Sequence, residues 1–273
     1  MTKPLQRFAR VALRAENDST ATMRTLLTDL DRELRTLQSR RVIDKTAQAQ
    51  IARILRKQSE AWAELSRVID RDREAARKAA NLAANDVDKQ FLDRLPISAK
   101  RRRELTSGAP FSRGETAKVA QRVSNSNKVA RNLLASRLNK ATGPKGAALA
   151  VRAQIQPRQK GGISYVAKRL VRTEMATAFH DAQIARAEAT PWVKGLRWVM
   201  SATHKGPDVC DKLSNRVFAP RRKSVPEIPH PNCMCTLEPV VMNNKEFKAA
   251  LAAGVFDAII GEKELSVAQR KAL

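Results

Sequence analysis

The sequence predicts a mainly helical α+β protein with a long N-terminal helical hairpin, a basic helical middle region and a small α+β C-terminal domain. Three observations predict this fold. Leucine-rich, heptad-like spacing fills the first third of the chain, and a stretch of almost purely basic charge follows it. After residue 190, short runs typical of strands alternate with proline and asparagine, which predicts a short antiparallel sheet. Aromatic residues make up only 4% of the chain, which favours aliphatic packing between helices.

The breaks in these patterns divide the chain into four regions. We assign residues 1–95 to the hairpin and 96–162 to the basic region, because Pro96 follows the last apolar stripe. Residues 163–262 form the predicted C-terminal domain, which begins after Gly161-Gly162. Residues 263–273 are left as a tail.

The hairpin is predicted from two apolar stripes that step by three and four residues. The first stripe is Met23, Leu27, Leu30, Leu34 and Leu37; the second is Ile51, Leu55, Trp62, Leu65 and Ile69, with Gln58 in one slot. Asp44 is placed to cap the second helix. The stripes indicate an antiparallel hairpin, or one long helix with a register slip. They serve as the protein's own core, and they also allow self-association.

Charge is concentrated in the middle of the chain. The whole chain has 52 Lys and Arg against 27 Asp and Glu, a net charge of +25. Residues 100–172 alone hold 18 basic and two acidic residues, a net charge of +16. Such a stretch favours nonspecific contact with the phosphates of double-stranded DNA. The candidate DNA-binding residues are Lys100, Arg101, Arg102, Arg103, Arg113, Lys118, Arg122, Lys128, Arg131, Arg137, Lys140 and Lys145.

Helices are expected over residues 113–139 and 145–155 within this region, and another over 163–188 after it. Strands are expected over residues 195–200, 216–218 and 235–241. A last helix, capped by Asn243 or Asn244, runs to about Ile260 and stops at Gly261. Trp192 and Trp198 are interpreted as core residues, and His180 as a solvent-facing or helix-packing side chain.

Every cysteine and two of the three histidines lie within residues 204–235. A structural zinc site needs four nitrogen or sulfur ligands, which often come as two close pairs from two turns. We predict one structural zinc held by His204, Cys210, Cys233 and Cys235, with His230 as the alternative ligand. The competing interpretation is that His230-Pro231-Asn232 forms a hydrogen-bonded turn and that the thiols are small buried side chains. Disulfides are less favoured, because a cytoplasm is reducing.

The order of the motifs in this part of the chain resembles a known family. Arg172-Thr173-Glu174 lies on a predicted helix, and a strand with Trp198 follows. Next come Asp208-Val209-Cys210-Asp211 and the run His230-Pro231-Asn232-Cys233-Met234-Cys235. Over residues 163–241 this order is similar to the phage head morphogenesis family, the minor head proteins that are like the F protein of phage Mu. Many members have a second cysteine where this chain has Leu213, and His204 offers a replacement ligand.

The resemblance implies a portal-associated minor head protein of a tailed bacteriophage, which binds portal protein, major capsid protein or both. Such a protein aids head assembly, packaging or DNA delivery, is made in the host cytoplasm and ends in the virion head. Arg172 and Glu174 are expected to form a structural ion pair between helix and sheet. We expect no enzyme, since Cys210 with His230 lacks a third catalytic group. The alternative is a metal-dependent nuclease or toxin-like effector packaged in the head. No apolar run is long enough to span a membrane.

Overall fold

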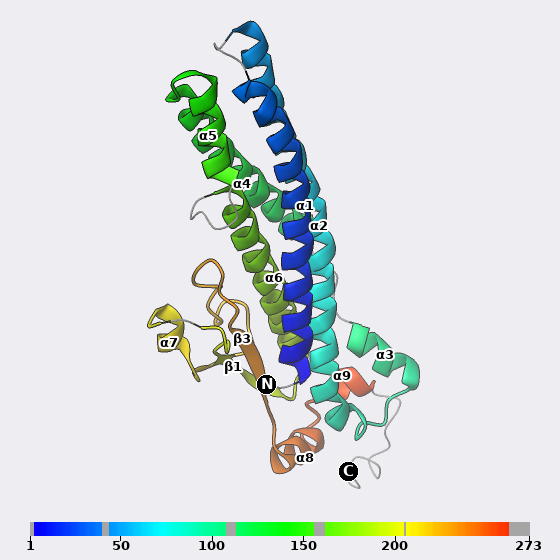
Figure 1. The fold of residues 1–273 in the computed structure, drawn as a ribbon. Coiled ribbons are helices and arrows are strands. Elements are labelled where there is room, and N and C mark those ends of the chain that lie inside the picture. Colours follow the sequence, from blue (N-terminus) through cyan, green and yellow to red (C-terminus); the bar gives the residue numbers. More distant parts are fainter. Residues whose placement is uncertain (1–2, 40–43, 108–112, 156–161, 205, 262–273) are drawn as a thin grey trace. The chain divides into compact units, whose positions relative to one another are not determined.

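The computed structural model describes residues 3–39, 44–107, 113–155, 162–204 and 206–261 (Figure 1). The helices are α1 (Lys3–Gln38), α2 (Lys45–Leu92), α3 (Ala99–Ser107), α4 (Arg113–Asn139), α5 (Gly143–Ile155), α6 (Ile163–Glu188), α7 (Val209–Leu213), α8 (Asn244–Ala252) and α9 (Asp257–Ile260). The strands are β1 (Val193–Val199), β2 (Val217–Phe218) and β3 (Thr236–Val241). The mainly helical α+β class is confirmed. The predicted tail, 263–273, lies outside the described residues.

The chain forms two compact units, each built from segments far apart in the sequence. The first unit combines residues 1–11, 73–110 and 176–273, and the second combines residues 12–72 and 111–175. The division of the sequence into consecutive regions stays a prediction. The first unit places the cysteine and histidine motifs of residues 204–235 together with the end of α2.

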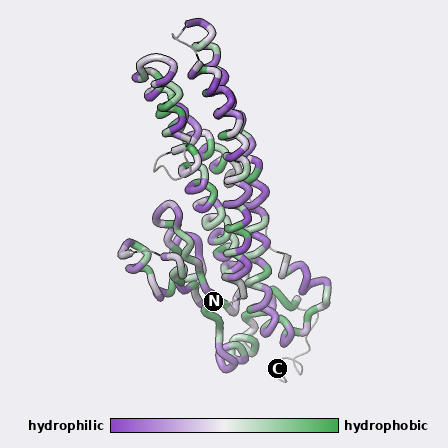
Figure 2. The backbone as a smooth tube through the Cα atoms, in the orientation of Figure 1, coloured by the Kyte–Doolittle hydropathy of each residue, from purple (hydrophilic) through white to green (hydrophobic). Residues whose placement is uncertain are grey.

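Helices α1 and α2 are antiparallel, as the contacts in the second unit demonstrate. The Gln50 amide donates to the Glu33 carbonyl oxygen over 2.9 Å, and Arg71 pairs with Asp18. Partners late in α1 therefore face the start of α2. The predicted cap is confirmed, because the Ala47 N–H donates to Asp44 Oδ1 over 2.8 Å. Figure 2 shows hydrophilic and hydrophobic residues interspersed along both helices, as expected when only one face is buried.

Three positions of the predicted stripes are wrong by one residue. The buried residues are Leu26, Gln50 and Ile54, whereas the predicted Leu27, Ile51 and Leu55 are only half-buried. The predicted and the buried sets both step by three or four residues, so spacing alone does not decide which of two adjacent residues faces the partner helix. Packing against the neighbouring helix makes that choice.

Gln58 occupies a buried position of the α2 stripe, and we expect its replacement to stabilise the protein. The side chain is fully buried, and neither its amide nitrogen nor its oxygen has a hydrogen-bond partner among the described residues. A buried amide without partners costs about 1–3 kcal/mol. Gln58→Met keeps the volume and removes that cost, so we expect it to raise the free energy of unfolding by about 1–3 kcal/mol. Denaturant titration measures this, with the exposed Gln48→Met as control; equal or lower stability than wild type would contradict it.

The second unit also contains α4, α5 and the first half of α6. Val119, Val123, Ala130, Leu134 and Leu138 are buried along one face of α4. The carboxylate of Glu174 is fully buried and accepts from Arg122 Nη2 over 2.8 Å. Arg172 instead donates to Glu16 Oε2 over 2.6 Å. The two residues of the predicted helix-to-sheet pair thus each bind a residue of another helix, because α6 lies beside α1 and α4 at that level.

The sheet of the first unit is small and antiparallel. Its strand order is β2-β1-β3, and Trp198 faces Leu237 across the central pair. Gly195 allows β2 to approach, since a Cβ there would lie 2.5 Å from a Val217 methyl group. These strands share one hydrophobic core with the end of α2. That core includes Phe91, Leu92, Leu95, Trp192, Leu196, Trp198, Leu237, Phe247 and Phe256.

The predicted last helix is two helices. Asn243 caps α8 as expected, in a reciprocal capping box with Glu246. The helix then ends at Ala252, because Gly254 adopts φ of 74°, a left-handed conformation that ends helices. Helix α9 follows and stops before Gly261, at the predicted position.

Candidate metal centre

The site begins at α7, a single turn that holds Cys210. Asp208 caps this helix, and its Oδ1 accepts from the Cys210 N–H over 2.6 Å. The Asp208 N–H in turn donates to Asp211 Oδ2 over 2.7 Å, which completes a reciprocal capping box. Two carboxylates flanking one cysteine therefore fix where the thiol points.

A tight turn supplies the opposite side of the site. The Cys233 N–H donates to the His230 carbonyl oxygen over 3.3 Å, which closes a four-residue turn. Proline is common at the second position of a type II turn, and Asn232 adopts the left-handed φ of 66° that the third position needs. The sequence His-Pro-Asn-Cys is therefore explained by the turn that it forms. It brings an imidazole and a thiol to one side of a turn.

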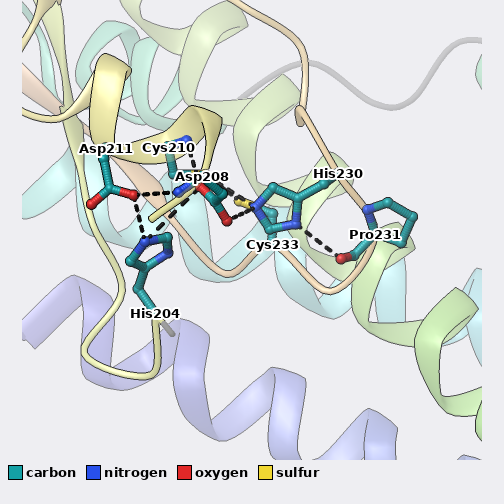
Figure 3. Close-up of polar contacts among 7 residues, drawn as sticks. All are labelled: His204, Asp208, Cys210, Asp211, His230, Pro231 and Cys233. Carbon is teal, nitrogen blue, oxygen red and sulfur yellow. Dashed lines mark hydrogen bonds and ion pairs between the residues drawn. The ribbon is translucent and has the colours of Figure 1, made fainter. Parts of the chain in front are cut away.

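The turn and α7 meet at the sulfur of Cys210 (Figure 3). Cys210 Sγ lies 3.2 Å from His230 Nε2 and 3.5 Å from Cys233 Sγ. The ligand atoms of His204 and Cys235 also lie close to that of Cys210, all three within 4.8 Å of one another. All three cysteines are buried and none is in a disulfide. The structure therefore brings together all five residues that the sequence predicted as ligands.

Both histidines are oriented by acceptors of their own (Figure 3). His230 Nδ1 lies 3.0 Å from the Pro231 carbonyl oxygen, and a carbonyl only accepts, so Nδ1 carries a proton. His230 Nε2 lies 3.1 Å from Asp208 Oδ2. His204 Nε2 lies 3.1 Å from Asp211 Oδ2 and 3.9 Å from Asp208 Oδ1. Hydrogen bonds of this kind orient histidines that bind metals.

The thiols differ in how readily they ionise. Burial raises the pKa of Cys210 to about 12. A hydrogen bond that the Cys233 thiol donates to Cys235 lowers the pKa of Cys235 to about 6. The same hydrogen bond raises the pKa of the donor, Cys233, and burial raises it further. The hydrogen bond to Asp211 raises the pKa of His204. The cluster thus favours one thiolate, at Cys235, beside an imidazole.

The buried Cys/His cluster can hold a metal ion. Metal–ligand bonds of about 2.0–2.3 Å in a tetrahedron place ligand atoms about 3.3–3.8 Å apart. The Cys210–Cys233 separation of 3.5 Å lies in that range, and the Cys210–His230 separation of 3.2 Å lies just below it. Thiolate sulfur and imidazole nitrogen are the ligands that zinc prefers in proteins. The donors form two close groups that share Cys210, one with His204 and Cys235 and the other with His230 and Cys233.

Helix α6 also reaches this site, through a residue whose role the sequence did not indicate. His180 is buried, and its Nε2 lies 2.8 Å from the carbonyl oxygen of Cys235. Burial lowers the pKa of His180 to about 4, so the ring is neutral. The expected solvent-facing position is wrong, because the ring is buried and packs edge-on against Trp198 of β1. Helical spacing alone does not distinguish a side chain aimed at a loop from one that packs on a helix.

The candidate DNA-binding residues fall into both units and differ in their contacts. In the first unit, Arg101 donates to Glu104 and Arg102 to Asp93. In the second, Arg122 binds the buried Glu174. The exposed ones are Lys100, Arg103, Lys118, Lys128, Arg131, Arg137, Lys140 and Lys145. The side chain of Arg113 lies outside the described residues.

Among the described residues, no helix combines the length and apolar character that a membrane crossing requires. Comparisons of the chain with protein-family models, with curated proteins and with solved structures found no significant match.

Proposed function

We propose that the protein is a minor head protein of a tailed bacteriophage, a structural component that binds portal protein, major capsid protein or both. One observation carries this proposal. Three of the four motifs that resemble the head morphogenesis family, which are separate segments of the sequence, lie around one centre. They are the strand with Trp198, the Asp208–Asp211 turn and the His230–Cys235 run. A shared centre gives a physical reason for their order along the chain.

The same centre favours a structural role over catalysis. A nucleophilic cysteine needs an accessible thiolate. Cys210 lies 3.2 Å from the His230 imidazole, but it is buried and its pKa is raised to about 12. Cys235, whose pKa is lowered to about 6, is buried as well. We therefore propose that this pair is not a catalytic dyad.

We further propose that the cluster binds one structural zinc. Its ligands are Cys210, Cys233 and Cys235 with one of the two histidines, His204 or His230. When bound, zinc would supply a cross-link and no chemistry, since four protein ligands leave no open position. Such a cross-link has clear value here, because α7 is one turn long and β2 has two residues. It would tie α7, the His230–Cys233 turn and the start of β3 together.

Contact with packaged double-stranded DNA is the third part of the proposal. The exposed cations of α4 lie in a stretch, residues 116–173, that contains no acidic side chain. Phosphate contacts of this kind position a protein on DNA without reading its sequence.

A protein inventory of purified procapsids and mature particles, made with and without portal protein, tests the proposed function. We expect the chain in particles at few copies relative to the capsid protein, and its loss from procapsids that lack portal protein. Absence of the chain from every particle preparation would reject the proposal.

A further inference from the structure

The segment that holds Cys233 and Cys235 is attached to α6 by hydrogen bonds from two side chains. His180 Nε2 lies 2.8 Å from the Cys235 carbonyl oxygen. Three residues further along the same helix, the Gln183 amide contacts Leu237. Gln183 Nε2 donates to the Leu237 carbonyl oxygen over 2.6 Å, and the Leu237 N–H donates to Gln183 Oε1 over 3.3 Å. Both backbone groups of Leu237 are thus bound by one side chain.

These contacts lie on the side of β3 where the sheet has no further strand. β3 lies at the edge of the sheet, with β1 on one side. An edge strand exposes N–H and C=O groups that another chain can pair with. Gln183 satisfies the outward-facing pair at Leu237 in the way that a neighbouring strand would. The position of β3 is therefore set from both sides, by β1 and by α6.

His180 itself has little freedom to move. It is only 2% exposed, and its ring meets the fully buried Trp198 edge-on at 5.2 Å. Its partner, a carbonyl oxygen, accepts only, so Nε2 carries the proton. A buried donor of fixed orientation thus holds the backbone of a cysteine whose side chain belongs to the metal centre.

We propose that His180 and Gln183 are positioning residues of the metal centre. They hold the Cys233–Cys235 segment at the spacing that zinc requires before the metal arrives. Neither is a ligand. This inference rests on the proposed zinc site and adds that metal affinity depends on α6, through hydrogen bonds to backbone atoms. Partners of metal ligands typically change metal affinity by about 10–100-fold when they are removed.

The test uses the full chain, because the core of this unit includes Phe91 and Leu92 from α2. Zinc affinity is measured by competition with a chromogenic chelator, and ligand geometry by the absorption spectrum of the cobalt(II) form. We expect His180→Leu and Gln183→Leu each to weaken zinc binding by about 10–100-fold and to alter the cobalt spectrum. His180→Gln, whose amide keeps a donor at similar reach, should recover much of the affinity.

Asp181→Asn is the matched control, since Asp181 lies between the two residues on α6 and pairs with Arg222. Its zinc affinity should equal that of wild type. Variants that melt at lower temperature but bind zinc as wild type does would overturn the inference and leave His180 as a packing residue. If His180→Leu does not fold, Gln183→Leu and His180→Gln decide the matter in the same way. A wild-type chain that binds no zinc would instead reject the zinc site itself.

Discussion

Removal of metal from the full chain is expected to lower the melting temperature of the unit that holds the Cys/His cluster by about 8–16 °C. A ligand present at about 1,000 times its Kd stabilises the folded state by about 4 kcal/mol, and each kcal/mol shifts the melting of a domain of this size by about 2–4 °C. The reason is local. α7 and the His230–Cys233 turn hold few hydrogen bonds of their own, so a zinc bound to both would supply much of what keeps them together.

Calorimetry of the zinc-loaded chain before and after treatment with a strong chelator measures this shift, and metal analysis should find about one zinc per chain. Cys233→Ser should lose both the metal and the shift. Ser39→Ala, far from the cluster in the sequence, serves as the control. A melt that is insensitive to chelator, in a chain without bound metal, would leave the three thiols as buried packing residues.

The same site gives a pH dependence whose sign follows from the thiols. Zinc binds thiolates, so protons compete with the metal. Burial raises the pKa of Cys210 to about 12, so this thiol stays protonated at neutral pH until zinc displaces the proton. Zinc affinity should therefore fall steadily as the pH is lowered, with protons released on binding. Affinity that is constant between neutral and mildly acidic pH would contradict thiolate ligation.

The sequence predicted best where a residue pattern has one structural solution. His230-Pro231-Asn232-Cys233 is such a case, because proline followed by asparagine favours a turn that brings its two ends together. Asp44 and Asn243 were likewise recognisable as caps, since each provides a side-chain oxygen at the start of an apolar periodic segment.

Prediction from the sequence failed where several positions or partners fit the same local pattern and only tertiary contacts distinguish them. Leu26 and Leu27 both fit a spacing of three or four residues, and only packing against α2 decides between them. His180 has no local feature that indicates its acceptor, the carbonyl oxygen of Cys235, 55 residues away in the sequence. Arg122 is a basic residue in a basic stretch, yet its guanidinium binds the buried Glu174. Net charge identifies a region and leaves open which of its cations are engaged inside the protein.

That distinction determines how DNA binding should be tested. Lys128, Arg131 and Arg137 are exposed on α4, and the sequence contains no acidic residue from 116 to 173. If they contact phosphates, each contact releases condensed counterions and contributes about −0.9 to the slope of log affinity against log salt. With about six to ten contacts in all, wild-type affinity for a random duplex should fall by about 10³–10⁵-fold between 50 and 200 mM salt.

Replacing Lys128, Arg131 and Arg137 together with alanine should make this slope shallower by about 2–3, as measured by fluorescence anisotropy on a labelled duplex of arbitrary sequence. The matched control replaces Arg56, Arg67 and Lys78, three exposed cations of α2 that each have a carboxylate one turn away. Their charge is already balanced locally, so the slope should stay near that of wild type. Binding that does not depend on salt, or an equal loss in the control, would reject phosphate contact by α4. Duplex that is cut during the measurement with added divalent metal would instead support the nuclease alternative, because a structural head protein leaves its DNA intact.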